Sequence, residues 1–202
     1  MDVTYHSHHG AVQESLHVFM EAGWDEALRT FSEGTLKVLE MGFGTGLNAL
    51  LTMQATIAAD REVQYTALEK FPLSIEMATQ LKYGDDAQAQ HTFGDIHRAG
   101  WGRSIGLSPS FSLCKKATAL EDFTSNDRYH LFFFDAFSPT AQPELWTEEI
   151  FRKLYDMAQQ GAVLVTYCSK SIVRKAMAAA GWQVTKIPGP RGKREMVRAY
   201  RR

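Results

Sequence analysis

The 202-residue sequence predicts an α/β fold, a single Rossmann-like domain in which a seven-stranded, mostly parallel sheet carries helices on both faces. Three observations predict it. Apolar runs of strand length alternate with amphipathic runs of helix length along most of the chain. The first such run, at 36–41, leads through three alternate glycines directly into a helical pattern. The last two runs, at 182–187 and 196–200, are separated by a loop, as in an antiparallel closing pair.

The elements are expected in one domain that spans 1–202, with a helical N-terminal cap over 1–35 and the Rossmann-like core over 36–202. Further strands are expected at 63–69, 111–115, 130–134 and 162–168, and further helices after Gly46 and at 71–83, 142–159 and 169–180. Residues 84–110 combine glycines, aspartates, serines and a proline with little periodicity. We therefore expect an irregular excursion there.

Composition argues against membrane-spanning and exported classes. The hydrophobic content of 45% suits one globular core, but the longest apolar runs, such as 131–134, are far too short to cross a bilayer. No basic start is followed by an apolar segment, so we expect a cytoplasmic protein without a membrane partner. His6, His8 and His9 lack cysteine or carboxylate neighbours at ligand spacing, and we expect no metal.

The net charge of −1 conceals a polarity along the chain. Residues 1–149 hold 21 acidic and 10 basic side chains, a balance of −11, whereas residues 150–202 hold 2 acidic and 12 basic, a balance of +10. Basic surface concentrated in one segment is typical of binding to a polyanion such as RNA. The alternative is that the two parts interleave in the fold and neutralise each other.

The glycine turn indicates a nucleotide pocket. Gly42, Gly44 and Gly46 permit backbone conformations closed to other residues, and the helix that follows offers unpaired amides to an anionic group. The dinucleotide fingerprint G-x-G-x-x-G would place a glycine at position 47, which is leucine. Glu40 before the turn suits a ligand with an ammonium group. The pattern therefore favours S-adenosylmethionine over NAD.

Two further acidic residues follow predicted strands. Glu69 ends the second strand, where a carboxylate can accept both ribose hydroxyls of a nucleotide. Asp135 follows the apolar run 130–134, so it should face the same crevice as Gly44. A carboxylate is costly to bury without a partner, which favours an active-site role. The alternative is that Asp135 only caps the following turn.

Seven segments, in order along nearly the whole chain, resemble one family. They are Tyr5-His6-Ser7 with Gly10, Glu14, Val18 and Phe19; Glu40 to Asn48; Glu69 to Pro72; Phe134 to Pro139; Gln142 to Thr147; Thr166 to Lys170; and Gly189-Pro190 with Gly192 to Met196. The combination G-F-G-T-G-L-N, D-x-F-x-P and G-K-R-E-M is specific. On these residues the chain resembles the methyltransferase-domain family of MnmC, the tRNA wobble-uridine enzyme, and especially its free-standing MnmD-like form.

The resemblance implies S-adenosylmethionine-dependent N-methylation of 5-aminomethyl-(2-thio)uridine at the wobble position of tRNA. By motif, the three glycines would hold the methionine part of the cofactor, Glu69 the ribose, and Asp135 would lie beside the reacting amine. Phe43 and Asn48 of the same motif complete the expected cofactor-binding set. Bifunctional family members also carry an oxidase that makes the amine. This sequence shows no second glycine fingerprint, so separate enzymes are expected to make the aminomethyl substrate.

The remaining expected site residues concern the RNA. Asp135 would accept the proton of the substrate ammonium and orient the free amine. Phe137, Ser138 and Pro139 would line the pocket, and Tyr167 would stack on the uracil. Lys193 and Arg194 would hold phosphates, with the alternative that they form a surface loop paired to Glu195.

Three other functions remain open from the sequence. A methyltransferase of a small amine or a protein would need no tRNA. An NAD-dependent oxidoreductase would need the glycine spacing that this chain lacks. A cofactor-binding module without catalysis would keep its binding when Asp135 is lost.

Overall fold

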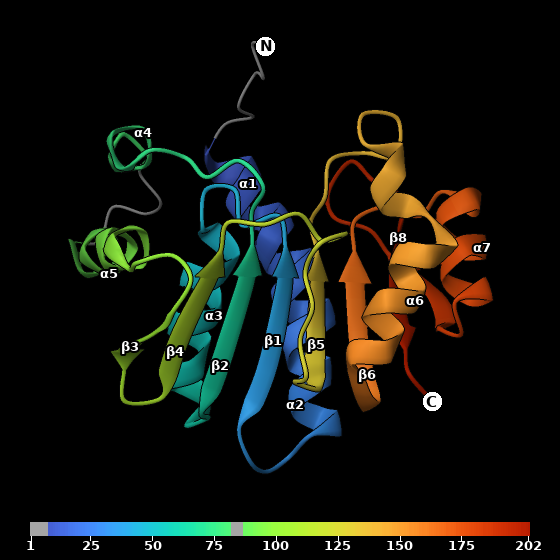
Figure 1. The fold of residues 1–202 in the computed structure, drawn as a ribbon, viewed down its shortest axis with the longest axis horizontal. Helices are drawn as coiled ribbons and strands as arrows, with labels where there is room; N and C mark the ends of the chain where they lie inside the picture. The colour runs from blue at the N-terminus through green and yellow to red at the C-terminus, as the bar shows by residue number, and fades with distance from the viewer. Residues whose placement is uncertain (1–7, 82–86) are drawn as a thin grey trace.

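A computed structural model describes residues 8–81 and 87–202. Its centre is one sheet in the order β3-β4-β2-β1-β5-β6-β8-β7 (Figure 1). The strands are β1 (Leu36–Met41), β2 (Val63–Leu68), β3 (Ser104–Ser108), β4 (Phe111–Lys116), β5 (Tyr129–Phe134), β6 (Ala158–Thr166), β7 (Gln183–Pro188) and β8 (Glu195–Tyr200). The five neighbouring strands β4, β2, β1, β5 and β6 are parallel to one another, and β8 runs antiparallel to both β6 and β7.

Helices cover both faces of the sheet, as expected from the apolar character of its central strands. One face carries α1 (His8–Ser15), the π-helix η1 (Leu16–Trp24), α2 (Asp25–Thr30), α3 (Leu47–Ala59) and α5 (Ala87–Arg98). The other carries the 3₁₀-helix η2 (Pro143–Trp146), α6 (Glu148–Met157) and α7 (Ser171–Ala179). In Figure 1, α3 and α2 lie behind the strands and α6 lies in front.

Strand β5 shows why the two layers hold together. Leu131 and Phe133 face the cluster beneath η1 and α3, whereas Phe132 and Phe134 face the cluster beneath α6. All four side chains are buried. Because neighbouring side chains of a strand point to opposite faces, this uninterrupted apolar run supplies both cores at once.

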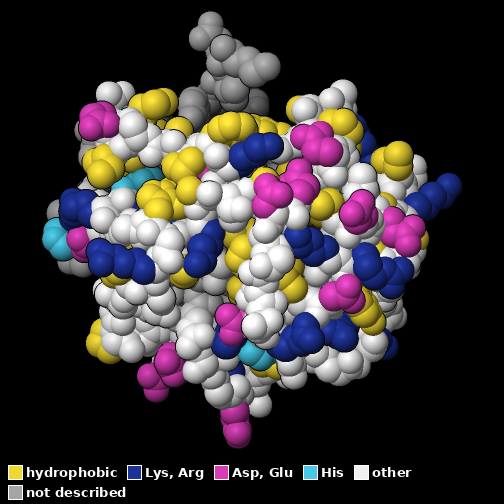
Figure 2. Space-filling model, viewed as in Figure 1, with side chains coloured by type: hydrophobic (Ala, Val, Ile, Leu, Met, Phe, Trp, Pro, Cys, Tyr) yellow, Lys and Arg dark blue, Asp and Glu magenta, His cyan; other side chains and the backbone are white. Residues whose placement is uncertain are grey.

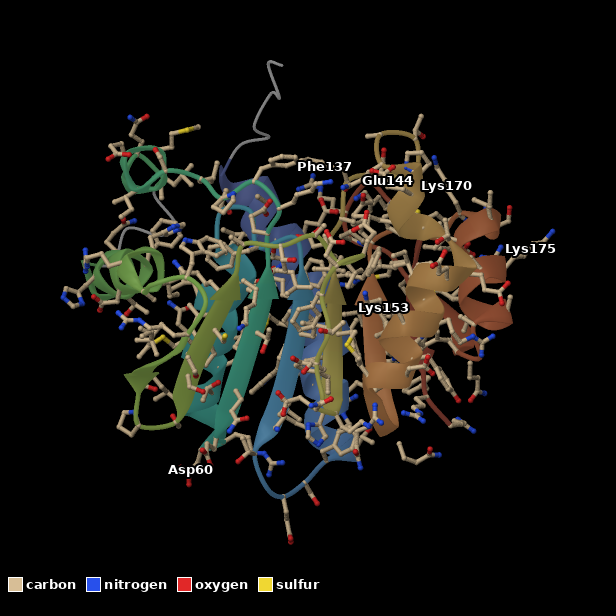
Figure 3. The ribbon with its side chains drawn as sticks, in the orientation of Figure 1. Asp60, Phe137, Glu144, Lys153, Lys170 and Lys175 are labelled. Atoms are coloured by element: carbon tan, nitrogen blue, oxygen red, sulfur yellow. The ribbon has the colours of Figure 1, made fainter. Side chains whose placement is uncertain are left out.

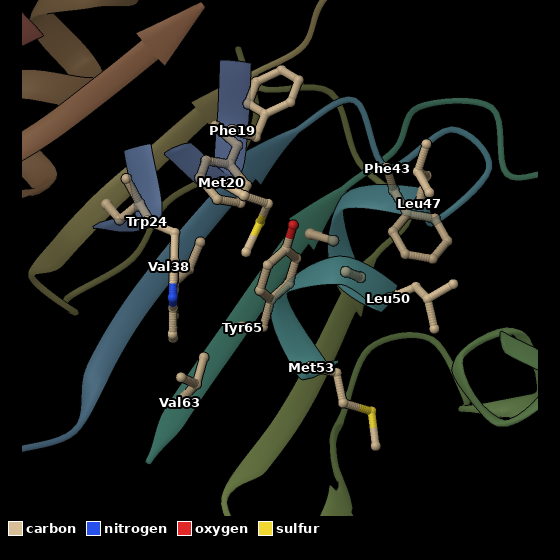
Figure 4. Packing of buried hydrophobic residues seen from close by; sticks show 14 of the residues in the cluster. Phe19, Met20, Trp24, Val38, Phe43, Leu47, Leu50, Met53, Val63 and Tyr65 are labelled. Carbon is tan, nitrogen blue, oxygen red and sulfur yellow. The ribbon is translucent and has the colours of Figure 1, made fainter. Parts of the chain in front are cut away.

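The N-terminal helices pack directly on the sheet. A Cβ added to Gly23 of η1 would lie 2.8 Å from Val165 Cγ2 and 3.1 Å from Phe133 Cε1, so the helix backbone approaches the strands very closely there. Figure 4 shows the ring of Tyr65 lying between η1, which carries Met20, and α3, which carries Leu50. The N-terminal helices η1 and α2 are therefore part of the hydrophobic core on one face of the sheet.

The expected irregular excursion over 84–110 was wrong. Residues 84–86 lie outside the described residues, but the rest contains helix α5 and the antiparallel edge strand β3. Ala89, Phe93 and Ile96 form the buried helical stripe of α5, which glycine and the polar residues between them obscure. Strand β3 brings the sheet to eight strands instead of the expected seven. None of its residues is buried, so no alternation of buried apolar and exposed polar residues indicates the strand.

The bounds of helices α4 and α6 also differ from expectation. Helix α4 spans only Ile75–Thr79. It begins after Ser74, whose side chain caps the helix by accepting a hydrogen bond from the Met77 amide at 3.2 Å. Helix α6 ends at Met157, and β6 begins at once, so the strand starts four residues earlier than expected. Among the described residues, no helix is long and apolar enough to cross a membrane.

Candidate functional site

The carboxyl ends of β1, β2, β5 and β6 place four functional side chains at one edge of the sheet. Glu40 is the second-last residue of β1. Glu69 directly follows β2, Asp135 directly follows β5, and Tyr167 directly follows β6. Figure 3 shows Phe137 at this edge and Asp60 at the opposite one. Parallel strands bring their carboxyl ends together, so residues far apart in sequence form one crevice.

The glycine turn has the backbone that its sequence predicts. Gly42, Gly44 and Gly46 have φ values of +89°, +50° and +79°, in the left-handed region. A Cβ at Gly42 would lie 2.5 Å from the Asp135 carbonyl oxygen, so this glycine lets the β1 and β5 loops touch. A Cβ at Gly44 would meet only the Gly42 carbonyl oxygen, 4.0 Å away. Gly44 therefore presents bare backbone to open space, as a bound ligand requires.

Asn48, in the first turn of α3, joins two carboxylates. Its Nδ2 donates to Glu40 Oε1 at 3.0 Å and to Asp135 Oδ2 at 3.2 Å. Glu40 is fully buried, and burial raises its pKa well above the usual range, with a further rise from Asp135, while the Asn48 hydrogen bond opposes both.

The polar atoms around Glu40 are not all satisfied. Among the described residues, Glu40 Oε2 and Asn48 Oδ1 are buried without a well-formed hydrogen bond, although the Tyr65 hydroxyl interacts with the Glu40 carboxylate and lowers its pKa. Unpaired buried acceptors are rare because each costs free energy. A ligand that donates hydrogen bonds beneath the glycine turn would satisfy them. The ammonium group of an amino-acid moiety is such a donor.

Glu69 connects the glycine turn to the loop after β2. Its Oε2 accepts from the Gly44 amide and its Oε1 from the Phe71 amide, each at 2.9 Å. The sequence predicted a carboxylate facing ribose hydroxyls, and the structure shows it fastening the turn itself. Each oxygen retains a second lone pair, so both contacts are compatible with a ligand.

Asp135 titrates near neutrality. Burial raises the pKa of Asp135 to about 7, the Asn48 hydrogen bond opposes the rise, Glu14 adds to it, and Lys193 lowers it. At neutral pH the carboxyl group is thus divided between its protonated and ionised forms. A side chain with this property can both accept and return a proton.

The expected substrate-side residues are only partly brought together. Phe137 is 69% exposed beside the crevice, and its carbonyl accepts the Trp146 Nε1–H at 2.8 Å. Ser138 holds the turn through its carbonyl, which accepts the Ala141 and Gln142 amides. Pro139 borders a separate cavity of about 440 Å³ between η2 and α7.

The two basic side chains expected to hold phosphates, in the loop after β7, have different surroundings. The Lys193 ammonium pairs with Glu14 and lies 4.4 Å from the centre of the Tyr167 ring. Arg194 is exposed near Glu195, whose carboxylate pairs with Lys186 at 2.8 Å. Lys193 therefore pairs with Glu14 and not with Glu195, which the alternative interpretation of the sequence had expected. Tyr167 is also less free to stack than expected, since Lys193 covers one ring face.

Sequence reasoning missed two residues that support the glycine turn. His97 Nε2 donates to the Thr45 carbonyl at 2.9 Å. The buried Lys115 ammonium donates to the carbonyls of Ile96 at 2.8 Å and His97 at 3.0 Å, at the end of α5, and lies 5.5 Å from the Phe43 ring centre. A signal was available, because Lys115 falls on the same face of β4 as the buried Phe111 and Leu113.

We expect Lys115→Met to loosen the glycine turn. The change leaves two helix-terminal carbonyls without their donor, which should cost about 1–3 kcal/mol of unfolding free energy. Affinity for the cofactor should fall several-fold because His97 and Phe43 lose their common support. Thermal unfolding and calorimetric titration measure the two effects. Lys116→Met is the matched control, since its ammonium makes one 3.3 Å contact with the Gly102 carbonyl at the surface.

No three His, Cys, Asp or Glu side chains gather within residues 8–81 and 87–202 in a way that could hold a metal ion. Tyr5, His6 and Ser7, which carry part of the resemblance, lie outside the described residues.

Comparison with known proteins shows which proteins this chain is similar to. A family model described as S-adenosyl-L-methionine-dependent methyltransferase matches residues 113–202. The "tRNA 5-methylaminomethyl-2-thiouridine biosynthesis bifunctional protein MnmC" of Cupriavidus metallidurans is 30% identical over 96% of this chain and 31% of its own length. The protein of the same name from Methylobacillus flagellatus is 29% identical over 96% of this chain and 32% of its own length. The chain spans about a third of the curated relatives that it matches.

Solved structures show the same fold. MNMC2 from Aquifex aeolicus superposes with a TM-score of 0.76 at 22% identity, covering 94% of this chain and 60% of that one. CalS10, an amino pentose methyltransferase from Micromonospora echinaspora solved with bound S-adenosylmethionine, gives a TM-score of 0.52 at 12% identity and 88% coverage of both chains. The chain therefore has the fold of the S-adenosylmethionine-dependent methyltransferases and is similar to the MnmC proteins over 96% of its length, and its cofactor is S-adenosylmethionine.

Proposed function

We propose that this chain methylates the amino group of 5-aminomethyl-(2-thio)uridine at the wobble position of tRNA. The names of the similar proteins support this choice of substrate, although those proteins are about three times longer. The observation that carries the proposal is Asp135, a half-buried carboxyl group with a pKa of about 7 at the glycine turn. An alkylammonium substrate needs such a base, because its protonated form has no lone pair for attack.

The cofactor would occupy the crevice with its amino-acid end toward Glu40 and its ribose toward Glu69. The unpaired atoms of Glu40 and Asn48 fit the ammonium group, and the bare backbone at Gly42, Gly44 and Gly46 fits close approach. A cavity of about 150 Å³ beside Gly44, lined in part by Phe43 and Trp101, gives further room. When bound, S-adenosylmethionine supplies an electrophilic methyl group on a sulfonium.

Asp135 would then prepare the amine. Its ionised form would accept a proton from the substrate ammonium, directly or through water, and so leave the nitrogen with a lone pair for the methyl group that the cofactor would supply. Asn48 fixes the carboxylate by its 3.2 Å hydrogen bond, so the amine is held in one orientation. Alignment of the reacting atoms contributes much of the acceleration of such in-line displacements.

The edge around Asp135 offers groups suited to an anticodon loop. Apolar side chains gather along this edge with basic side chains beside them (Figure 2). Phe71, two residues after Glu69, and Phe137, two residues after Asp135, are both exposed. Exposed aromatic rings can stack on unpaired bases, and Lys193, Arg194 and Lys170 can hold phosphates. Lys170 lies on the same edge as Phe137 (Figure 3). We assign Ser138 and Pro139 to the wall of this region.

The test is methyl transfer from labelled S-adenosylmethionine to tRNA that carries 5-aminomethyluridine at the wobble position. We expect product with the unaltered protein. In Lys193→Ala/Arg194→Ala, RNA binding should weaken, and the slope of log affinity against log salt should shrink by about 0.7–0.9 per lost phosphate contact. Lys153→Ala is the control, since its ammonium contacts the Glu121 carbonyl away from the strand ends.

Other outcomes would contradict the assignment. Product on a small amine or a peptide but not on the modified tRNA would indicate a different methyltransferase substrate. Cofactor binding without product on any of these would indicate a binding module.

A further inference from the structure

The Lys193 ammonium lies in a cage of aromatic and acidic groups. It pairs with the Glu14 carboxylate of α1 and lies 4.4 Å from the centre of the Tyr167 ring. Aromatic faces attract alkylammonium groups, most strongly when a carboxylate completes the site. An exposed ion pair alone is weak. The ring beneath the charge makes this a recognition geometry for an ammonium group.

The aromatic floor of the cage is fixed in place. The Tyr167 hydroxyl donates to the Ala136 carbonyl at 2.9 Å, and the Trp146 ring packs edge-on at a centroid distance of 6.1 Å. Ala136 directly follows Asp135 in the chain. The cage therefore adjoins the carboxyl group to which we assign proton transfer.

The charges of the cage also influence the pKa of Asp135, which precedes the Ala136 carbonyl that Tyr167 contacts. Glu14 raises and Lys193 lowers the pKa of Asp135, and Asp135 and Glu14 both contribute to the raised pKa of Tyr167 after its burial. The other groups that face Asp135 are Asn48 of α3, which donates to it, and the buried Glu40 of β1, which shares the same amide.

We propose that Glu14 and Tyr167 form the binding site for the ammonium group of the substrate, and that Lys193 fills this site until the substrate enters. The inference rests on the proposed function, which supplies an aminomethyl substrate. The substrate ammonium would replace the Lys193 ammonium between the Tyr167 face and Glu14, within reach of Asp135. Specificity for an amine over a neutral substituent follows from the cage, because only a cation gains from both groups.

The test compares two anticodon stem–loops that differ only at the wobble base, one with 5-aminomethyluridine and one with the neutral 5-hydroxymethyluridine. Dissociation constants are measured with S-adenosylhomocysteine bound, so that no turnover occurs. Phosphate contacts are common to both RNAs and cancel in the ratio of the two constants. The unaltered protein should prefer the aminomethyl RNA by roughly three- to tenfold.

The variants give opposite expected signs. Glu14→Gln and Tyr167→Leu should bring the ratio toward one. Lys193→Ala should raise the ratio because the internal competitor is gone. Glu21→Gln is the matched control: this carboxylate lies on the adjoining π-helix and pairs with His17 at 2.9 Å, so its loss should leave the ratio unchanged.

Each result decides a separate question. An unchanged ratio in Glu14→Gln, or a lowered ratio in Lys193→Ala, would overturn the cage while RNA binding still stands. Equal affinity of the unaltered protein for the two RNAs would do the same. Absence of binding to either RNA would contradict the proposed function, and the inference with it.

Discussion

Asp135→Asn is expected to lower the rate of methyl transfer by roughly 10²- to 10⁴-fold, the usual contribution of a positioned general base. Asparagine keeps an oxygen for the Asn48 hydrogen bond, which is 3.2 Å long in the structure, so the crevice should stay intact. Cofactor affinity should therefore change little. In the unaltered protein the rate should rise with pH through about 7, as Asp135 ionises, and the variant should lack this limb.

The same substitution has an effect on stability with a definite sign. The pKa of Asp135 is raised from 3.8 to about 7 in the folded protein, so the folded state binds more protons than the unfolded state between these values. The contribution of Asp135 to stability is therefore full below pH 4 and is lost as the pH rises through 7. The measured quantity is the unfolding temperature of Asp135→Asn minus that of the unaltered protein. This difference should be more positive at pH 8 than at pH 4.

Asp60→Asn serves as the control for both effects. Asp60 lies at the opposite edge of the sheet, and its φ of +49° suits asparagine (Figure 3). An Asp135→Asn protein that methylates at the normal rate across the pH range would remove Asp135 from the mechanism. So would a rate limb near pH 7 that persists in the variant.

Gly44→Ala is expected to abolish most cofactor binding while leaving the fold intact. The backbone at Gly44 has φ +50°, so alanine costs about 1 kcal/mol in unfolding free energy, but its Cβ would meet no neighbour closer than 4.0 Å. The methyl group would instead fill the space to which we assign the cofactor. We expect the dissociation constant for S-adenosylmethionine to rise at least about tenfold, the equivalent of about 1.4 kcal/mol.

Gly34→Ala separates backbone strain from blocked binding. Gly34 has φ +74°, and an added Cβ there has nothing within 4 Å. Both variants should lose a few degrees of unfolding temperature. Only Gly44→Ala should lose cofactor affinity in calorimetric titration. Equal cofactor affinity in the two variants would show that the cofactor does not approach the turn at Gly44.

Prediction from sequence succeeded where a local pattern carried the information. The glycine turn, Glu69 and Asp135 each follow an apolar strand, and the parallel sheet brings strand ends together whatever the details of packing. It failed for α5 and β3. The helix buries a narrow stripe among polar residues, and the edge strand is defined by its pairing with β4 rather than by its own alternation.

The sequence by itself determined the parallel strands of the sheet, the glycine turn, the acidic residues at the strand ends and the resemblance to a methyltransferase family. Only the tertiary structure decided which groups support and complete the crevice. Glu14 and Lys193 lie 179 residues apart, and Lys115 meets the His97 carbonyl across 18 residues, so no local periodicity joins them. Such contacts depend on where whole helices and loops pack, and the pKa of Asp135 depends on the burial and charges that this packing creates.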